Sequence, residues 1–296
     1  MRRLLLALFL AGCFLGAAAC GGNDEGGAVA TSTGAEAEDG AGPGTAVEDT
    51  VAAGTARFEI VATIETGGKE LDLDAKGETN LGEDRTRMDI DFSALAEVAG
   101  GGEAADPALY RGEAIYDGEV LYIRLPALTA ALPEEVDWLR VDASTLAEQA
   151  GQQFNAPDPT EFIRFVDAMK DAEEVGEEEI RGDQTTHFRG TVAVSDLAAA
   201  ATEEDRAEAT SFAERLEAAG VESFPLDLWL DEENRVRQLR VEYEAQQEGT
   251  EVRLLTVVEL FDYGEEADIE PPPANEVTNF DDIAGRGAEE TEHSEP

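Results

Sequence analysis

The most constraining feature of this sequence is the alternation of apolar and polar residues between positions 224 and 263. Successive side chains of a strand point to opposite faces of a sheet, so an apolar residue at every second position predicts one buried face. Residues 224–231 and 235–245 alternate in this way, and the polar residues 232–234 between them are typical of a turn. Residues 252–263 are apolar on both faces, which predicts a strand deep inside the sheet. We therefore expect three consecutive antiparallel strands, around which the rest of the domain is built.

The same alternation occurs upstream in shorter stretches that are separated by turn residues. A glycine pair, Gly67–Gly68, separates the first two of these stretches, and Asp117–Gly118 and Gly182–Asp183 each lie at the centre of a predicted hairpin. The predicted strands before the organising three cover residues 58–64, 71–76, 87–92, 115–125, 138–142, 173–181 and 185–194. Together these stretches predict an antiparallel sheet of nine or ten strands.

Three stretches have the features of helices. A short helix is predicted over residues 144–153 and a longer one over residues 202–220. Between them, Asp158 and Pro159 form a good start signal, and the apolar residues that follow recur at helical spacing. Three helices are too few to cover a flat sheet of this size. The sequence therefore predicts an α+β fold over residues 55–270, with a strongly curved antiparallel β-sheet, or half-barrel, covered by a few α-helices.

The first residues have the pattern of a lipoprotein signal peptide, assigned here to residues 1–19. Arg2 and Arg3 precede a short apolar run and then small residues that end at Cys20, which is the expected lipidation site. Cys13 is the alternative, because the residues before it match the lipobox of bacterial lipoproteins more closely by letter. Cys20 is preferred because a longer apolar run precedes it and a polar segment follows it. Residues 20–54 are then expected to form a disordered acidic tether, and residues 271–296 a disordered acidic tail.

Charge and composition limit the chemistry of the chain. With 67 acidic and 21 basic residues, the formal net charge of −46 makes nucleic acid an unlikely partner by electrostatic repulsion. Outside the first twenty residues there is no cysteine, and no catalytic motif, metal-binding spacing or cofactor fingerprint is recognised. We therefore expect no enzyme activity, no metal and no cofactor. His187, Trp138 and Trp229 are interpreted as structural residues.

The apolar faces of the predicted strands and of the central helix must meet inside the curved sheet. If the interior is hollow, these residues line a ligand-binding cavity, and if it is filled, they form an ordinary core. The candidate lining residues are Phe58, Ile60, Leu71, Leu73, Met88, Ile90, Phe92, Leu121, Ile123, Phe162, Phe165, Val166, Met169, Leu226, Leu228, Leu239 and Val241.

Three stretches together resemble a known group of proteins: residues 120–126 with 138–142, residues 182–192, and residues 224–231 with 235–239. In these stretches the chain is similar to actinobacterial lipoproteins of the LppX/LprG type, within the LolA-like superfamily. The similarity spans about residues 55–265 and is a pattern of strands rather than a catalytic signature. It implies a half-barrel sheet closed by helices around an apolar cavity that accepts acyl chains.

By this resemblance, the protein is expected to be an extracytoplasmic lipoprotein that an N-terminal acyl anchor, such as palmitate, holds at the cell membrane. Its expected ligand is a lipid or lipoglycan, which it binds or transports. The alternative is a non-catalytic envelope sensor or scaffold whose interior is filled by its own side chains and whose partner is another envelope protein.

Overall fold

The computed structural model describes residues 42–96, 106–118, 120–129, 132, 136–142, 159–203, 206–247 and 249–280. The expected signal peptide with Cys20, the first part of the expected tether, the helix predicted over residues 144–153 and the last part of the expected tail lie outside these residues.

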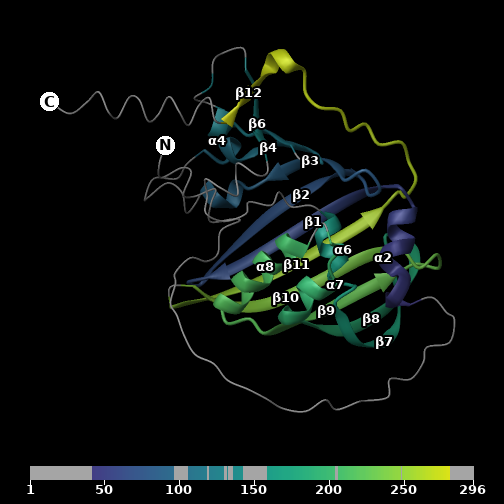
Figure 1. Cartoon of the computed structure of the whole chain (residues 1–296). Coiled ribbons are helices and arrows are strands. Elements are labelled where there is room, and N and C mark those ends of the chain that lie inside the picture. Colours follow the sequence, from purple (N-terminus) through teal and green to yellow (C-terminus); the bar gives the residue numbers. More distant parts are fainter. Residues whose placement is uncertain are drawn as a thin grey trace.

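The described strands form one sheet in the order β12-β6-β5-β4-β3-β2-β1-β11-β10-β9-β8-β7 (Figure 1). All neighbours are antiparallel except β12 and β6, which are parallel. The strands are β1 (Thr55–Thr66), β2 (Lys69–Asn80), β3 (Arg85–Asp91), β4 (Arg111–Asp117), β5 (Val120–Arg124), β6 (Trp138–Asp142), β7 (Met169–Ile180), β8 (Asp183–Ala193), β9 (Ser223–Leu230), β10 (Val236–Gln247), β11 (Thr250–Phe261) and β12 (Val277–Asn279). The predicted curved, mostly antiparallel sheet with few helices is therefore confirmed.

The three strands expected to organise the domain are β9, β10 and β11, and they pair in sequence order. Leu239 of β10 lies opposite Leu228 of β9 on one side and Val258 of β11 on the other. β11 then pairs with β1, where Phe58 lies opposite Leu260. β11 joins the two halves of the sheet, in agreement with its apolar residues on both faces.

Two hairpin turns have the backbone that their sequences predict. Gly67 and Gly68 link β1 to β2 with φ angles of 56° and 76°. Arg181 and Gly182 link β7 to β8 with φ angles of 54° and 92°, so this turn lies one residue earlier than expected. Positive φ at both central residues matches the twist of the flanking strands, and glycine adopts it without steric cost.

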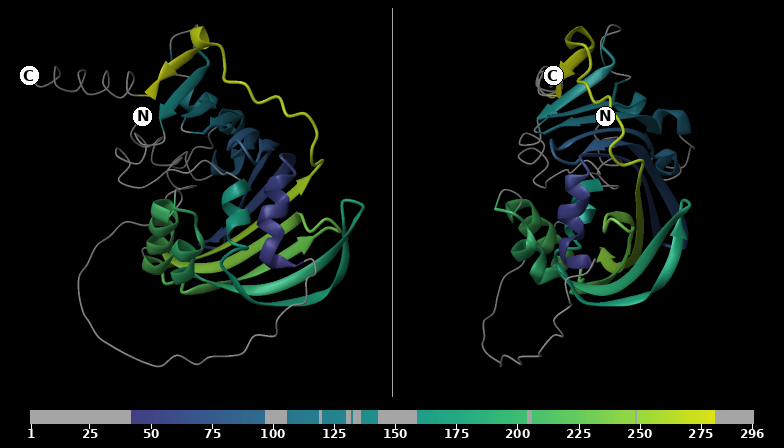
Figure 2. Two further views of the ribbon diagram at one scale, coloured as in Figure 1. Left: turned by 45° about the vertical axis from the view of Figure 1, so that its right-hand side comes forward. Right: turned by 90° about the vertical axis from the view of Figure 1, so that its right-hand side faces the viewer.

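The helices lie on the inner side of the curved sheet, mostly against β9, β10 and β11 (Figures 1 and 2). They are α2 (Pro43–Ala52), α4 (Pro126–Thr129), α6 (Pro159–Arg164), α7 (Leu197–Ala200) and α8 (Arg206–Ala218), with short 3₁₀ turns η1 (Ser93–Leu95), η2 (Pro107–Tyr110), η3 (Val194–Asp196) and η4 (Ala274–Glu276). α8 confirms the helix predicted over residues 202–220. α6 is shorter than predicted: it ends at Arg164, and Met169 already belongs to β7.

Both expected disordered segments extend too far into the fold. The tether expected over residues 20–54 is wrong in its last part, because α2 packs on the inner side and buries Ala46 and Thr50 completely. The tail expected from residue 271 is wrong in its first part, because β12 pairs with β6. In each case the segment has few large apolar residues, so the local composition gives little sign that it packs on the fold.

Candidate functional site

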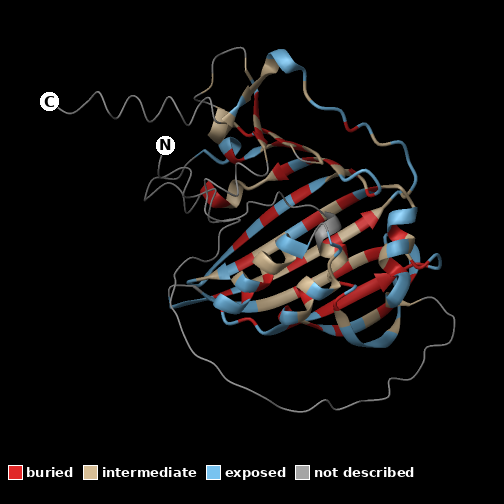
Figure 3. Ribbon diagram, viewed as in Figure 1, coloured by how far each residue is buried: buried red, intermediate tan, exposed pale blue. Residues whose placement is uncertain are grey.

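All predicted lining residues lie on the inner side of the sheet, in or against two buried apolar clusters (Figure 3). The large cluster includes Phe58, Ile60, Met88, Ile90, Leu121, Ile123, Val166, Leu226, Leu228, Leu239 and Val241, with Phe162, Phe165 and Met169 packed against it. The small cluster includes Leu71 and Leu73 together with Ile64, Leu95, Tyr110 and Val252. Phe92 packs against both clusters. The side chains of the two clusters are almost fully buried, so much of the inner side is a dense core.

Partly exposed apolar side chains lie between these two clusters. Phe92 and Ala127 contact both of them, and Ala62 and Leu254 pack against the small cluster. Tyr243 packs against the large cluster and lies directly opposite Leu254 in the β10–β11 pair. We call these five residues the junction. They form an apolar surface on the inner side that the described part of the chain does not fully cover.

A row of aromatic rings leads from α6 to the junction. Phe162 contacts Phe165 edge-on, with ring centroids 5.8 Å apart. Phe165 stacks on Phe212 of α8 at 5.7 Å and meets Phe224 of β9 at 5.6 Å. Phe224 in turn lies 5.9 Å from the ring of Tyr243. The rings of Phe162, Phe165, Phe212 and Tyr243 are partly exposed, whereas Phe224 between them is buried, and the row ends at a phenol hydroxyl.

The environment of Tyr243 keeps that phenol protonated. Burial raises the pKa of Tyr243 to about 12, against an opposing effect of the nearby Arg215 cation. The hydroxyl therefore remains a hydrogen-bond donor at any physiological pH. The sequence placed Tyr243 on the apolar face of its strand but gave no reason to select it. Its position in the junction depends on the register of β10 against β11, which no local pattern reveals.

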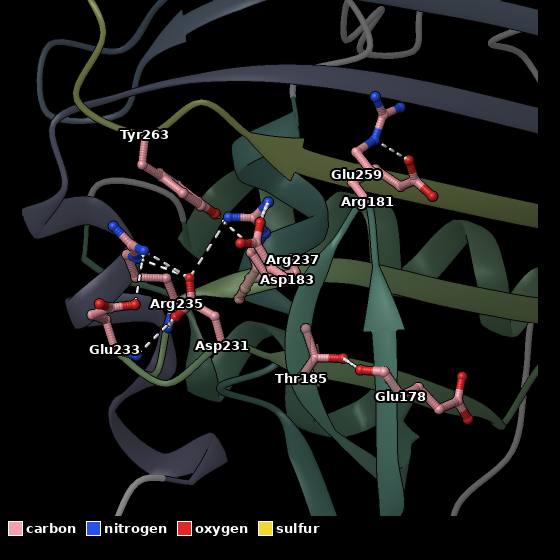
Figure 4. A network of polar contacts seen from close by, with 11 residues as sticks. Glu178, Arg181, Asp183, Thr185, Asp231, Glu233, Arg235, Arg237, Glu259 and Tyr263 are labelled. Carbon is pink, nitrogen blue, oxygen red and sulfur yellow. Dashed lines mark hydrogen bonds and ion pairs between the residues drawn. The ribbon is translucent and has the colours of Figure 1, made fainter.

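A polar network closes the end of the sheet where β9 turns into β10 (Figure 4). Nε of Arg235 donates to Asp231 at 3.0 Å, and Arg237 forms an ion pair with Asp183 of β8. The hydroxyl of Tyr263 donates to the carbonyl of Val236, and burial raises the pKa of this phenol as well. The network ties β8, β9 and β10 together, and it is structural in character.

His187, Trp229 and Trp138 lie on the outer side. His187 is buried, stacks on Trp229 at 4.2 Å, and has Nε2 2.7 Å from a carboxylate oxygen of Asp227. Arg189 donates to the same oxygen at 2.7 Å. Trp138 is buried in a separate small apolar cluster. These contacts support the interpretation of all three as structural residues.

Two hollows formed by described residues also lie on the outer side. The larger is a groove of about 490 Å³ across β1 to β4, lined by the outward-facing residues Glu59, Val61, Asp74, Lys76, Asp89, Asp91 and Arg111. Its walls carry charged residues on both sides, and burial together with repulsion from Asp91 and Asp72 raises the pKa of Asp74. A smaller groove of about 300 Å³ runs beside it. Charged walls do not suit an acyl chain, so the apolar candidate site is the inner one.

Within the described residues, no three side chains of the metal-binding type gather in one place. The helices of the described part are also too short or too polar to cross a membrane.

No protein-family model and no curated protein matches this chain. Among solved structures, it is similar to the lipoprotein LppX of Mycobacterium tuberculosis, with a TM-score of 0.41, 10% identity, and coverage of 77% of this chain and 98% of that one. It is similar to LprF of Mycobacterium bovis, with a TM-score of 0.41, 13% identity, and coverage of 78% and 97%. A chain of the Pseudomonas aeruginosa MucA/MucB complex matches with a TM-score of 0.31, 12% identity, and coverage of 79% and 62%.

Proposed function

We propose that this protein is an extracytoplasmic lipoprotein that binds or carries a lipid or lipoglycan on the inner side of its half-barrel. The observation that carries the proposal is the junction: apolar side chains of β1, β10 and β11, together with Phe92 and Ala127, that stay partly exposed between two dense clusters. Exposed apolar surface on the concave side of a sheet costs free energy unless something covers it. An acyl chain has the shape and polarity to do so, and the partly exposed rings of the aromatic row add to the surface it would contact.

The direct test fills the junction with a large side chain. In Ala62→Trp, the indole enters the junction, so we expect little change in melting temperature and a loss of fluorescent fatty-acyl binding. Its matched control is Val61→Trp on the same strand, because Val61 is 41% exposed on the outer side. The control should keep both binding and stability. Equal loss of binding in the two variants, or no saturable binding by the parent protein, would contradict the proposal.

Leu228→Trp is expected to behave differently, because Leu228 is fully buried in the large cluster. Overpacking such a site costs about 1–3 kcal/mol. A chemical denaturation curve should therefore show a lower free energy of unfolding, in contrast to Ala62→Trp. Unchanged stability of Leu228→Trp would indicate empty space beside β9.

The proposed anchor is Cys20, through which acyl chains would hold the protein at the outer side of the cell membrane. Two or more chains anchor stably where one is marginal. We expect Cys20→Ala to abolish partitioning into the detergent phase, and Cys13→Ala to leave the protein lipidated. Mass spectrometry of the mature N-terminus checks the assignment, and an acylated Cys20→Ala protein would overturn it.

A sensor or scaffold that acts through a protein partner is the second candidate. It is favoured by the dense packing of most inner residues and by the charged grooves on the outer side. Mass spectrometry of the purified protein separates the two functions, because a carrier is expected to retain lipid and a self-filled scaffold is not.

A further inference from the structure

Beside Phe212, the aromatic row carries a cation that no carboxylate of the described residues neutralises. Arg215, in the last turn of α8, is partly buried, and its guanidinium lies over the ring of Phe212, 5.6 Å from the centroid. No carboxylate of the described residues lies within 4 Å of it. This chain has 67 acidic residues, and most arginines of the sheet form an ion pair with a carboxylate. Arg215 differs from them because it is partly buried and has no such partner among the described residues.

Tyr243 supplies an unused hydrogen-bond donor at the same place. Its ring packs against Phe224, and its hydroxyl has no hydrogen-bond partner among the described residues. The end of α8 is fixed against β10 by a hydrogen bond of 2.9 Å from the Gln246 amide to the carbonyl of Ala219. Arg215 lies one turn before Ala219, and the ring of Phe212 beneath it is linked to Tyr243 through the rings of Phe165 and Phe224. A cation on α8 and a neutral donor on the neighbouring strand β10 thus lie beside the same row of aromatic rings.

This arrangement has the parts of a site for an amphiphile with an anionic headgroup. We propose that Arg215 and Tyr243 bind the anionic group, a carboxylate or a phosphate, of an amphiphile whose acyl chain lies along the aromatic row and the junction. The proposal rests on the proposed lipid-binding function and specifies its ligand class. A guanidinium donates paired N–H bonds to a carboxylate or phosphate, and the phenol adds a third donor.

The net negative charge of the protein repels an anionic headgroup. The local positive charge of Arg215 therefore decides whether the site prefers an anionic or an uncharged amphiphile. A net charge of −46 repels anions at long range, although salt screens that repulsion beyond about 8–10 Å. At contact distance, in a partly buried site, the hydrogen bonds of Arg215 act against it with less screening. An uncharged amphiphile would leave the guanidinium and the hydroxyl without partners, which is costly once the site is covered.

The test compares two amphiphiles of equal chain length, dodecanoate and 1-dodecanol, by isothermal titration of the full mature chain at pH 8. We expect dodecanoate to bind about tenfold more tightly, as a charge-assisted hydrogen bond would provide. Arg215→Gln should remove this preference and leave the affinity for 1-dodecanol unchanged, whereas Arg215→Lys should retain part of it. Tyr243→Phe should reduce the preference without abolishing it.

Arg206→Gln is the matched control, because Arg206 lies in the same helix and is exposed, and the variant changes the net charge equally. It should bind both amphiphiles as the parent does. A comparison of dodecyl phosphate with inorganic phosphate shows whether the site binds the headgroup of an amphiphile or a free anion. Inorganic phosphate that binds as tightly as dodecyl phosphate would overturn the amphiphile assignment. Equal affinity of the parent for dodecanoate and 1-dodecanol would overturn the headgroup site and leave the proposed function intact, and binding of neither would overturn both.

Discussion

Replacing Gly77 by alanine is expected to destabilise the domain by about 3 kcal/mol, the upper end of the usual cost of overpacking. Gly77 lies on the inner face of β2, opposite Met88 of β3. A Cβ at this position would lie 1.9 Å from the carbonyl oxygen of Arg87 and 2.8 Å from the Cα of Met88. Both are backbone atoms, so the side chain could be accommodated only if β3 moved away. Gly112 of β4 has the same relation to β5, with a Cβ 2.1 Å from the carbonyl oxygen of Arg124.

Thermal and urea unfolding of Gly77→Ala measure this effect. For a domain of this size, about 3 kcal/mol corresponds to a fall in melting temperature of roughly 6–12 °C. The control is Gly44→Ala in α2, where nothing lies within 4 Å of the new Cβ. Alanine favours helix over glycine by up to about 1 kcal/mol, so the control should be neutral or slightly stabilising. An unchanged melting temperature for Gly77→Ala would show that β2 and β3 do not approach as closely as described.

These two glycines also show what the sequence could and could not predict about curvature. A curved sheet was expected because three helices cannot cover a flat sheet of about ten strands, an argument from counting alone. The places where neighbouring strands approach most closely were not predicted. Gly77 sits in a strand with regular alternation, and only the close approach of the Arg87 carbonyl explains why a side chain is absent there.

The strands themselves were predictable because alternation is a local property. Phe58 and Ile60, or Leu226 and Leu228, face the same side whatever the rest of the chain does. The junction was less accessible to prediction. Leu254 and Tyr243 meet only through the β10–β11 register, and Arg215 reaches the site only because α8 docks on the end of β10. The pairing of Leu254 with Tyr243 and the position of Arg215 both depend on contacts between elements that are far apart in the sequence. Local sequence patterns do not predict such contacts.

The N-terminal helix is the clearest difference between sequence and structure, because polar contacts add to the packing of Ala46 and Val47 in holding it. The side-chain amide of Asn234 donates to Thr45 at 2.9 Å and to Asp49 at 2.8 Å. The amide of Val236, a fully buried residue, donates to the hydroxyl of Thr50 at 2.9 Å. A threonine that caps the start of a distant strand looks, in sequence, the same as a threonine in a tether. α2 is nevertheless an integral part of the domain.

Removing α2 should therefore destabilise the domain, whereas shortening the segment before it should not. Deletion of residues 43–52 uncovers part of the large cluster, including the site filled by Ala46, and removes the partners of Asn234 and Val236. We expect a loss of about 2–4 kcal/mol, seen as a melting temperature lower by roughly 4–16 °C. Deletion of residues 23–41, which are rich in glycine, alanine and acidic residues, should leave it nearly unchanged.

A point variant tests how much the docking of α2 contributes to stability without changing the length of the chain. Thr50→Val keeps the shape of the side chain but leaves the buried Val236 amide without its acceptor, which costs about 1–3 kcal/mol. Val51→Thr is the matched control, because Val51 is 39% exposed on the same helix. It should change stability by no more than a few tenths of a kcal/mol, as is usual for exposed helical positions. If Thr50→Val and the deletion of residues 43–52 both melt like the parent, α2 contributes nothing to the fold and the tether extends to β1 after all. If Thr50→Val lowers the free energy of unfolding and Val51→Thr does not, the anchor segment ends at α2, and the helix fixes how the half-barrel is held on its tether.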